Sequence, residues 1–174
     1  MRRQHVVLLG MMGSGKTTVG DLLAARINRP YRDSDRDIES ITGRTGRQIA
    51  VSDGVDELHR LEEEVLLNAL GSTQPCVVSG AGWIVESPRC RAAIQRTATA
   101  VWLRLSPEDL RTRMDHGTHR RDLPNEELWL LIARREPLLL DLADIVIEAT
   151  GSPIDIVNEL VRSMAPAATH DDAM

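Results

Sequence analysis

A glycine-rich segment near the amino terminus has the residue types needed to bind the phosphates of a nucleotide. Residues 10–17 read GMMGSGKT, which matches G-x-x-x-x-G-K-[ST], and they lie between an apolar run and an amphipathic segment. Glycines let such a loop curl until its N–H groups point inward, and the helix that follows adds partial positive charge. We assign nucleotide binding to the last residues of this segment and their next neighbour: Gly13, Ser14, Gly15, Lys16, Thr17 and Thr18.

A segment with this pattern is called a P-loop, and within it Lys16 and Thr17 have the most specific chemistry. A lysine at this place bridges the β- and γ-phosphates, and the next hydroxyl ligates Mg²⁺, which prefers oxygen ligands. Lys16 is the single lysine in the chain, which suits a position that needs a compact and flexible ammonium group. The motif predicts binding of ATP with Mg²⁺ but does not identify the phosphoryl acceptor.

Two carboxylates follow the next short apolar segment. We predict a strand over residues 30–33, so Asp33 and Asp35 fall at the carboxyl edge of the sheet, where open α/β folds bind ligands. Residues two apart on an extended backbone point to the same side. We therefore expect Asp33 to hold Mg²⁺-bound water and Asp35 to accept the proton of an acceptor hydroxyl. A solvated turn or a helix cap is the alternative interpretation of this pair.

The elements that must position these residues alternate along the chain. Short apolar runs separated by longer helical patterns are typical of βαβ units, and they predict an α/β fold with a five-stranded parallel sheet and helices on both faces. The expected strands are residues 5–9, 30–33, 75–79, 98–105 and 145–147. The expected helices are residues 15–27, 55–70, 88–95 and 153–164, with two more beginning near residues 106 and 125.

Length and composition indicate one compact domain. The chain has 174 residues, of which we assign 1–164 to the domain, 116–124 to an exposed mobile loop and 165–174 to a disordered tail. A net charge of -5 and an aromatic content of 2% argue against nucleic acid as a partner. No apolar stretch approaches the roughly 18 residues of a membrane span, so we expect a cytoplasmic protein without a membrane partner.

These motifs, in this order, resemble the shikimate kinase family. The resemblance extends over about residues 4–162, and it is much more specific than the P-loop alone. It rests on the P-loop, on Asp33-x-Asp35, on residues 42–49 and 61–66, on the turn formed by Gly80, Ala81 and Gly82, and on residues 135–138.

The resemblance implies a three-layer P-loop fold and a small-molecule kinase of the shikimate pathway. Such an enzyme transfers a phosphoryl group from Mg²⁺-bound ATP to a ring hydroxyl of shikimate, giving shikimate 3-phosphate and ADP. By resemblance, Asp35 binds the acceptor hydroxyls, Asp33 assists the metal and Arg135 binds the substrate carboxylate. Arg120 or its neighbour Arg121 corresponds to the lid arginine over the transferring group.

Further roles come from the same resemblance. Arg113 would cover the face of the adenine, and the turn from Gly80 to Gly82 would lie against the substrate. The resemblance also implies a monomer.

The acceptor side departs from the family pattern. His59 stands where the family has an arginine that pairs with the substrate carboxylate, so a forked cation is replaced by an imidazole. Arg60 is adjacent but points about 100° around the helix. The family's Gly-Gly-Gly turn becomes Gly80-Ala81-Gly82 followed by Trp83, a bulky residue that we expect to narrow the site.

Three interpretations remain open on these residues. The protein is a shikimate kinase that binds the carboxylate through Arg135 and Arg60. Alternatively, it phosphorylates a related cyclic polyol without a carboxylate, since a site that lacks the fork no longer penalises an uncharged analogue. The third interpretation is a nucleotide-binding module with weak catalysis.

Overall fold

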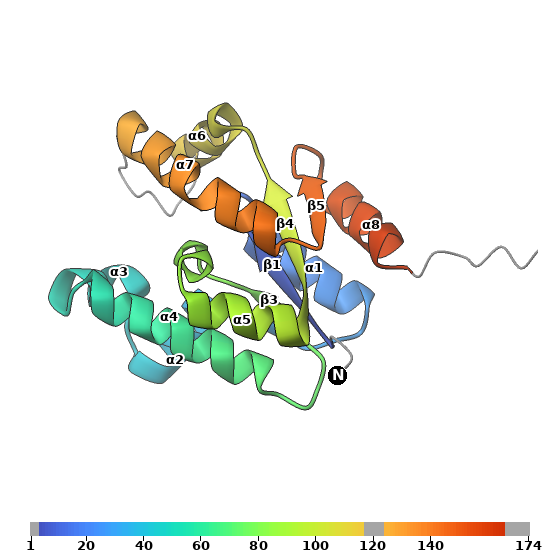
Figure 1. Ribbon diagram of the computed structural model, residues 1–174, viewed down its shortest axis with the longest axis horizontal. Helices are drawn as coiled ribbons and strands as arrows, with labels where there is room; N and C mark the ends of the chain where they lie inside the picture. Colours follow the sequence, from blue (N-terminus) through green and yellow to red (C-terminus); the bar gives the residue numbers. More distant parts are fainter. Residues whose placement is uncertain (1–3, 117–123, 166–174) are drawn as a thin grey trace, which may run out of the picture.

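The computed structural model describes residues 4–116 and 124–165. Its centre is a parallel five-stranded sheet with the order β2-β3-β1-β4-β5 (Figure 1). The strands are β1 (His5–Leu9), β2 (Tyr31–Asp33), β3 (Val77–Ser79), β4 (Ala98–Arg104) and β5 (Ile145–Glu148). The fold class expected from the sequence is confirmed.

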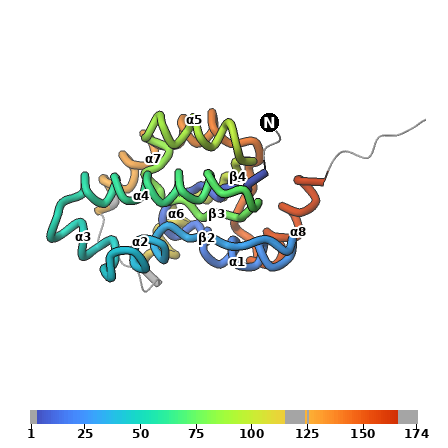
Figure 2. The backbone as a smooth tube through the Cα atoms, turned by 90° about the horizontal axis from the view of Figure 1, so that it is seen from below, coloured from blue at the N-terminus to red at the C-terminus, as the bar shows by residue number. Residues whose placement is uncertain are grey.

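Helices cover both faces of the sheet. The helices are α1 (Lys16–Arg26), α2 (Ser34–Thr42), α3 (Gly46–Ser52), α4 (Val55–Leu70), the 3-10 helix η1 (Gly82–Val85), α5 (Pro88–Thr97), α6 (Pro107–His116), α7 (Asn125–Leu142) and α8 (Pro153–Met164). Figure 2 shows α1 and α8 on one side of the sheet and α5 and α7 on the other.

The central strand β1 explains why an apolar run precedes the P-loop. All five of its residues are buried, and successive side chains face opposite layers. Val6 and Leu8 pack into the core formed with α1 and α8, while Val7 and Leu9 pack into the core formed with α4 and α5. A strand that is covered on both faces favours apolar residues in succession, as in Val6 to Leu9.

Helices α2 and α3 are absent from the sequence-based expectation. Each is a short helix with a single buried apolar residue, Ile38 in α2 and Ile49 in α3, so neither has a run of buried apolar positions like that of α4. These two residues join Leu58, Leu61 and Val65 of α4 in a small core of their own. Tertiary packing against α4 therefore stabilises helices that their own sequences signal weakly.

Some expectations fall outside the described residues. Except for His116, Pro124 and Ala165, the expected lid at residues 116–124 and the expected tail at residues 165–174 belong to the part of the chain that is not described. Among residues 4–116 and 124–165, none of the helices is long and apolar enough to cross a membrane.

Candidate active site

The P-loop connects β1 to α1 through three glycines with positive φ. Gly10, Gly13 and Gly15 have φ angles of +145°, +79° and +92°, and Gly15 directly precedes the first turn of α1. A Cβ atom on Gly10 would lie 2.8 Å from both the Leu103 carbonyl oxygen and Ser14 Oγ. Glycine at these positions follows from backbone conformation and close packing.

The P-loop has the groups that a phosphate chain needs. Lys16 Nζ donates hydrogen bonds to the carbonyl oxygens of Gly10 and Met11, at 2.9 and 3.0 Å. Burial lowers the pKa of Lys16 to about 8, although the charges of Asp35 and Asp33 oppose this shift. Ser14 Oγ is buried and has no hydrogen-bond partner among the described residues. A buried ammonium and an unpartnered hydroxyl at a helix N-terminus fit an anionic ligand.

Thr17 and Asp33 meet beside the P-loop. Thr17 Oγ1 donates to Asp33 Oδ2 over 2.9 Å, although the two residues belong to different elements. The hydroxyl of Tyr31 lies 2.9 Å from the same carboxylate oxygen and 2.7 Å from Ser79 Oγ, which in turn donates to the Lys16 carbonyl. A hydroxyl and a carboxylate next to a phosphate site form a donor set that fits Mg²⁺.

Tyr31 and Ser79 are site residues that the motif-based reasoning missed. Burial raises the pKa of Tyr31 above its ordinary range, so its hydroxyl stays protonated and can keep hydrogen bonding to Asp33. Gly20 of α1 allows this arrangement, because a Cβ atom there would lie 2.4 Å from the Tyr31 ring. Ser79 ends β3, and this place was its available signal, since parallel strands bring their carboxyl ends to one edge, whereas Tyr31 begins β2 and had no such signal.

Asp33 is both a site residue and a helix cap. Its Oδ1 accepts the backbone N–H groups of Asp35 and Arg36, at 3.1 and 3.3 Å, and thereby caps α2. The expectation of an extended backbone through Asp35 is wrong, because Asp35 lies in the first turn of α2. The cap and the metal-facing role, which the sequence offered as alternatives, use different oxygens of one carboxylate.

One cavity of about 400 Å³ brings most of the expected site residues together. Its lining includes eleven of them: Gly13, Lys16, Thr17, Asp33, Asp35, His59, Gly80, Ala81, Gly82, Arg113 and Arg135. Ser14, Gly15 and Thr18 are not part of this lining, and Arg120 lies outside the described residues.

Arg135 reaches the cavity from α7 as a buried cation. Its side chain is 8% exposed, and its Nε donates to Glu86 Oε1 over 2.6 Å. Burial lowers the pKa of Arg135, and the hydrogen bond to Glu86 opposes that shift. A Cβ atom on Gly82 would lie 3.0 Å from Arg135 Nη1, so the glycine leaves space for the guanidinium. Sequence reasoning missed Glu86, which orients this arginine.

His59 and Trp83 form a stacked pair on the cavity wall. Their ring centroids are 4.2 Å apart and their planes differ by 7°, which joins α4 to η1. Trp83 lines the cavity, as expected from its position after the glycine turn. The suggestion that Arg60 helps to bind a carboxylate is wrong: Arg60 pairs with Glu57 and Glu64 on the exposed side of α4 and does not line the cavity.

Arg113 of α6 lies against the P-loop. Its Nη2 donates to the Ala149 carbonyl over 2.6 Å, and its Nη1 lies 3.5 Å from the Ser14 carbonyl. The guanidinium therefore bridges the P-loop and the segment after β5, next to where a nucleotide would bind.

Comparison with known proteins agrees with this geometry. The sequence model described as shikimate kinase matches residues 12–165. Shikimate kinase of Symbiobacterium thermophilum is 35% identical over 167 residues, covering 92% of this chain and 95% of that protein.

Solved structures give the same result. Shikimate kinase from Acinetobacter baumannii in complex with shikimate is similar with a TM-score of 0.84 and 27% identity over 92% of each chain. Shikimate kinase from Aquifex aeolicus has a TM-score of 0.80 and 26% identity, over 91% of this chain and 95% of that one. With the P-loop, the carboxylates after β2 and a buried arginine in one cavity, this chain belongs to the shikimate kinase family.

Proposed function

We propose that this protein transfers the γ-phosphoryl group of ATP to a ring hydroxyl of shikimate, giving shikimate 3-phosphate and ADP. One observation carries the proposal: a single cavity holds the P-loop lysine, the Thr17–Asp33 pair, Asp35 and Arg135. Phosphoryl transfer depends mainly on positioning and on neutralising charge, and these groups supply both.

The nucleotide side uses the P-loop and the carboxylate after β2. Backbone N–H groups from Gly13 to Thr18 hold the phosphates, and the ammonium group of Lys16 neutralises their charge. Thr17 and Asp33 would hold Mg²⁺, which neutralises phosphate charge when bound. Arg113 covers the adenine. Arg120, which lies outside the described residues, supplies a further positive charge to the transferring group.

The acceptor side uses Asp35 and Arg135. Asp35 accepts the proton of the attacking hydroxyl, since it lines the cavity together with Lys16 and Asp33. Arg135 is held by Glu86 and presents its guanidinium to the substrate carboxylate. The backbone from Gly80 to Gly82 and the His59 ring complete the wall around the substrate. We further propose a monomer in the cytoplasm, with no nucleic-acid or membrane partner.

A second acceptor class is favoured by one observation. The stacked His59–Trp83 pair presents a flat wall where the family's pattern has an arginine, so charge recognition of a carboxylate depends on Arg135. A cyclic polyol without a carboxylate would lose less in this site than in one with two arginines. The second candidate function is therefore phosphorylation of such a polyol.

Steady-state assays of ADP release separate the candidates. With Mg-ATP, we expect saturable turnover on shikimate that exceeds turnover on carboxylate-free cyclitols such as myo-inositol. His59→Arg should lower the KM for shikimate about tenfold, because a charge-assisted hydrogen bond contributes roughly 1.5–3 kcal/mol.

Arg60→Ala is the matched control, because this neighbouring cation pairs with glutamates outside the cavity. The KM of this variant for shikimate should stay unchanged. Turnover on a cyclitol without turnover on shikimate would support the second function. ADP binding without turnover on either substrate would indicate a nucleotide-binding module.

A further inference from the structure

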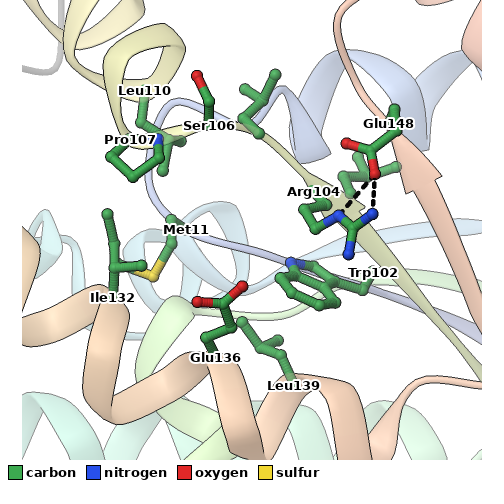
Figure 3. Close-up of a pocket in the computed structure, with 12 residues that line it drawn as sticks. Met11, Trp102, Arg104, Ser106, Pro107, Leu110, Ile132, Glu136, Leu139 and Glu148 are labelled. Atoms are coloured by element: carbon green, nitrogen blue, oxygen red, sulfur yellow. Dashed lines mark hydrogen bonds and ion pairs between the residues drawn. The ribbon is translucent and has the colours of Figure 1, made fainter.

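A second cavity lies at the same edge of the sheet, at the carboxyl ends of β4 and β5. It measures about 310 Å³, which is at the small end of ligand-binding cavities. Figure 3 shows its wall formed by β4, α6, α7 and the P-loop. Its lining does not include Lys16, Asp33 or Asp35, so it is distinct from the acceptor and phosphate cavity.

The second cavity has an apolar interior, and charged side chains line its rim. The interior is formed by Met11, Trp102, Leu110, Ile132 and Leu139. Ring-shaped apolar groups bury the most surface in such a space, and the Trp102 ring offers a face or edge for stacking.

The rim has an excess of negative charge. Arg104 is held by Glu148 and lies over the Trp102 ring, 5.5 Å from its centroid. The Glu136 carboxylate projects from α7 toward the same ring (Figure 3). One arginine and two glutamates leave a net charge of -1, which favours a cationic ligand.

Three elements separate this cavity from the active site, and each faces both. In the P-loop, the side chain of Met11 lines the second cavity while its carbonyl accepts Lys16 Nζ, and the next residue, Met12, lines the active site. In α7, Glu136 lines the second cavity and the adjacent Arg135 lines the active site.

Helix α6 repeats the arrangement. Leu110 lines the second cavity, and Arg113, one turn later, lines the active site and contacts the P-loop. A ligand that fills the second cavity therefore contacts the elements that hold Lys16, Arg113 and Arg135. Two sites that share walls are coupled when either ligand shifts those walls.

We propose that this cavity binds a small organic amine with an aromatic or alicyclic ring and that its occupancy changes the affinity of the P-loop for nucleotide. The ring packs against Trp102 and Leu139, and the ammonium group pairs with Glu136. The proposal concerns nucleotide affinity and does not depend on which acceptor is phosphorylated.

Binding can be tested with phenethylamine as the probe and with 2-phenylethanol and phenylacetate as uncharged and anionic analogues. In ¹H–¹⁵N spectra, phenethylamine should shift the Trp102 indole signal, assigned with Trp102→Phe, and leave the Trp83 signal in place. We expect the Kd of phenethylamine to rise at least fivefold in Glu136→Gln. Glu127→Gln, an exposed glutamate in the first turn of α7, is the matched control and should have no effect.

Coupling is read from the Kd of ADP with and without saturating phenethylamine, where we expect at least a threefold change that is lost in Glu136→Gln. Equal affinity for the three probes, or equal affinity in Glu136→Gln and the unmodified protein, would overturn the site. An unchanged Kd for ADP at saturation would overturn the coupling. Either result leaves the proposed kinase activity intact.

Discussion

At the scale of single residues, Asp35 is the side chain on which the proposed chemistry depends most directly. It lies at the start of α2 and lines the same cavity as Lys16 and Arg135. Asp35 is close enough to Lys16 that its negative charge opposes the lowering of the lysine pKa by burial. A carboxylate in this place can accept the proton of an acceptor hydroxyl while the phosphoryl group is held by the P-loop.

Asp35→Asn should leave ADP affinity within about threefold of the unmodified value and should lower kcat roughly 10²–10⁴-fold, the usual contribution of a general base. Asp37→Asn is the matched control on the same helix, because Asp37 pairs with Arg32 and does not line the cavity. Steady-state kinetics and ADP titration measure both effects. Near-normal kcat in Asp35→Asn would remove Asp35 from the mechanism.

The lowered pKa of Lys16 predicts a pH-dependent affinity for nucleotide. In the folded protein without nucleotide, the pKa is about 8, compared with an ordinary value of 10.5. Phosphates bind the charged form, so the Kd of ADP should rise as pH increases above 8, by up to about tenfold per unit. A fluorescent ADP analogue titrated between pH 7 and 9.5 measures this slope. Lys16→Met should bind ADP weakly, and its Kd should not vary with pH in this range. An equal pH dependence in Lys16→Met would show that Lys16 is not the titrating group.

The same pKa affects stability with the opposite sign. Between about 8 and 10.5 the unfolded chain binds more protons at Lys16 than the folded protein does. The free energy of unfolding contributed by this group therefore rises with pH across that window, while nucleotide affinity falls. Burial disfavours the charged form of Lys16 in the ligand-free fold, whereas the phosphates of a bound nucleotide would favour that form.

At the scale of secondary structure, the end of β2 and the start of α2 form one functional unit. Asp33 directs Oδ1 to the backbone of α2 and Oδ2 to Thr17 and Tyr31. The same residue thus fixes the helix that carries Asp35 and the oxygen that would face the metal.

Two substitutions separate these roles. Asp33→Asn keeps an oxygen that can cap α2, so the free energy of unfolding should change little. The loss of the carboxylate charge should raise the Mg²⁺ concentration that turnover requires. Asp33→Ala also removes the cap and should cost about 1 kcal/mol more. Urea unfolding and Mg²⁺ titration of kcat give the two readouts. Equal stability of the two variants would show that the cap contributes nothing to stability.

At the scale of the whole molecule, the parallel sheet brings every proposed function to one edge. The carboxyl ends of β1, β2 and β3 lead to the active-site cavity, and those of β4 and β5 lead to the second cavity. Helices α6 and α7 contribute residues to the lining of both cavities. Binding at the edge therefore involves residues from both halves of the sheet.

Ligand binding should consequently stabilise the entire fold. The Mg²⁺–ADP complex at 100 times its Kd should add about 2.7 kcal/mol to the free energy of unfolding, which a thermal melt records as a higher Tm. Thr17→Val should reduce the extra stabilisation that Mg²⁺ adds to that of ADP. The stabilisation measured with ADP in the presence of EDTA should stay unchanged. If Mg²⁺ contributes equally in both proteins, Thr17 is not a ligand.

Much of this protein follows from its sequence alone, for reasons of local chemistry. The P-loop needs glycines where φ is positive, and β1 needs apolar residues from Val6 to Leu9 because both of its faces are covered. Such requirements act on neighbouring residues, so they leave a pattern that can be read along the chain. The family, the sheet and the place of the P-loop before α1 were all predictable on this basis.

Tertiary structure decided the features that depend on contacts between distant residues. Helices α2 and α3 are stabilised by Ile38 and Ile49, which pack on α4, and a short helix that buries a single apolar residue is hard to recognise from its own sequence. Likewise, Glu86 orients Arg135 across 49 positions, and Trp83 stacks on His59 across two elements. These pairings and the second cavity have no local signature, because they bring together residues that are far apart in the sequence.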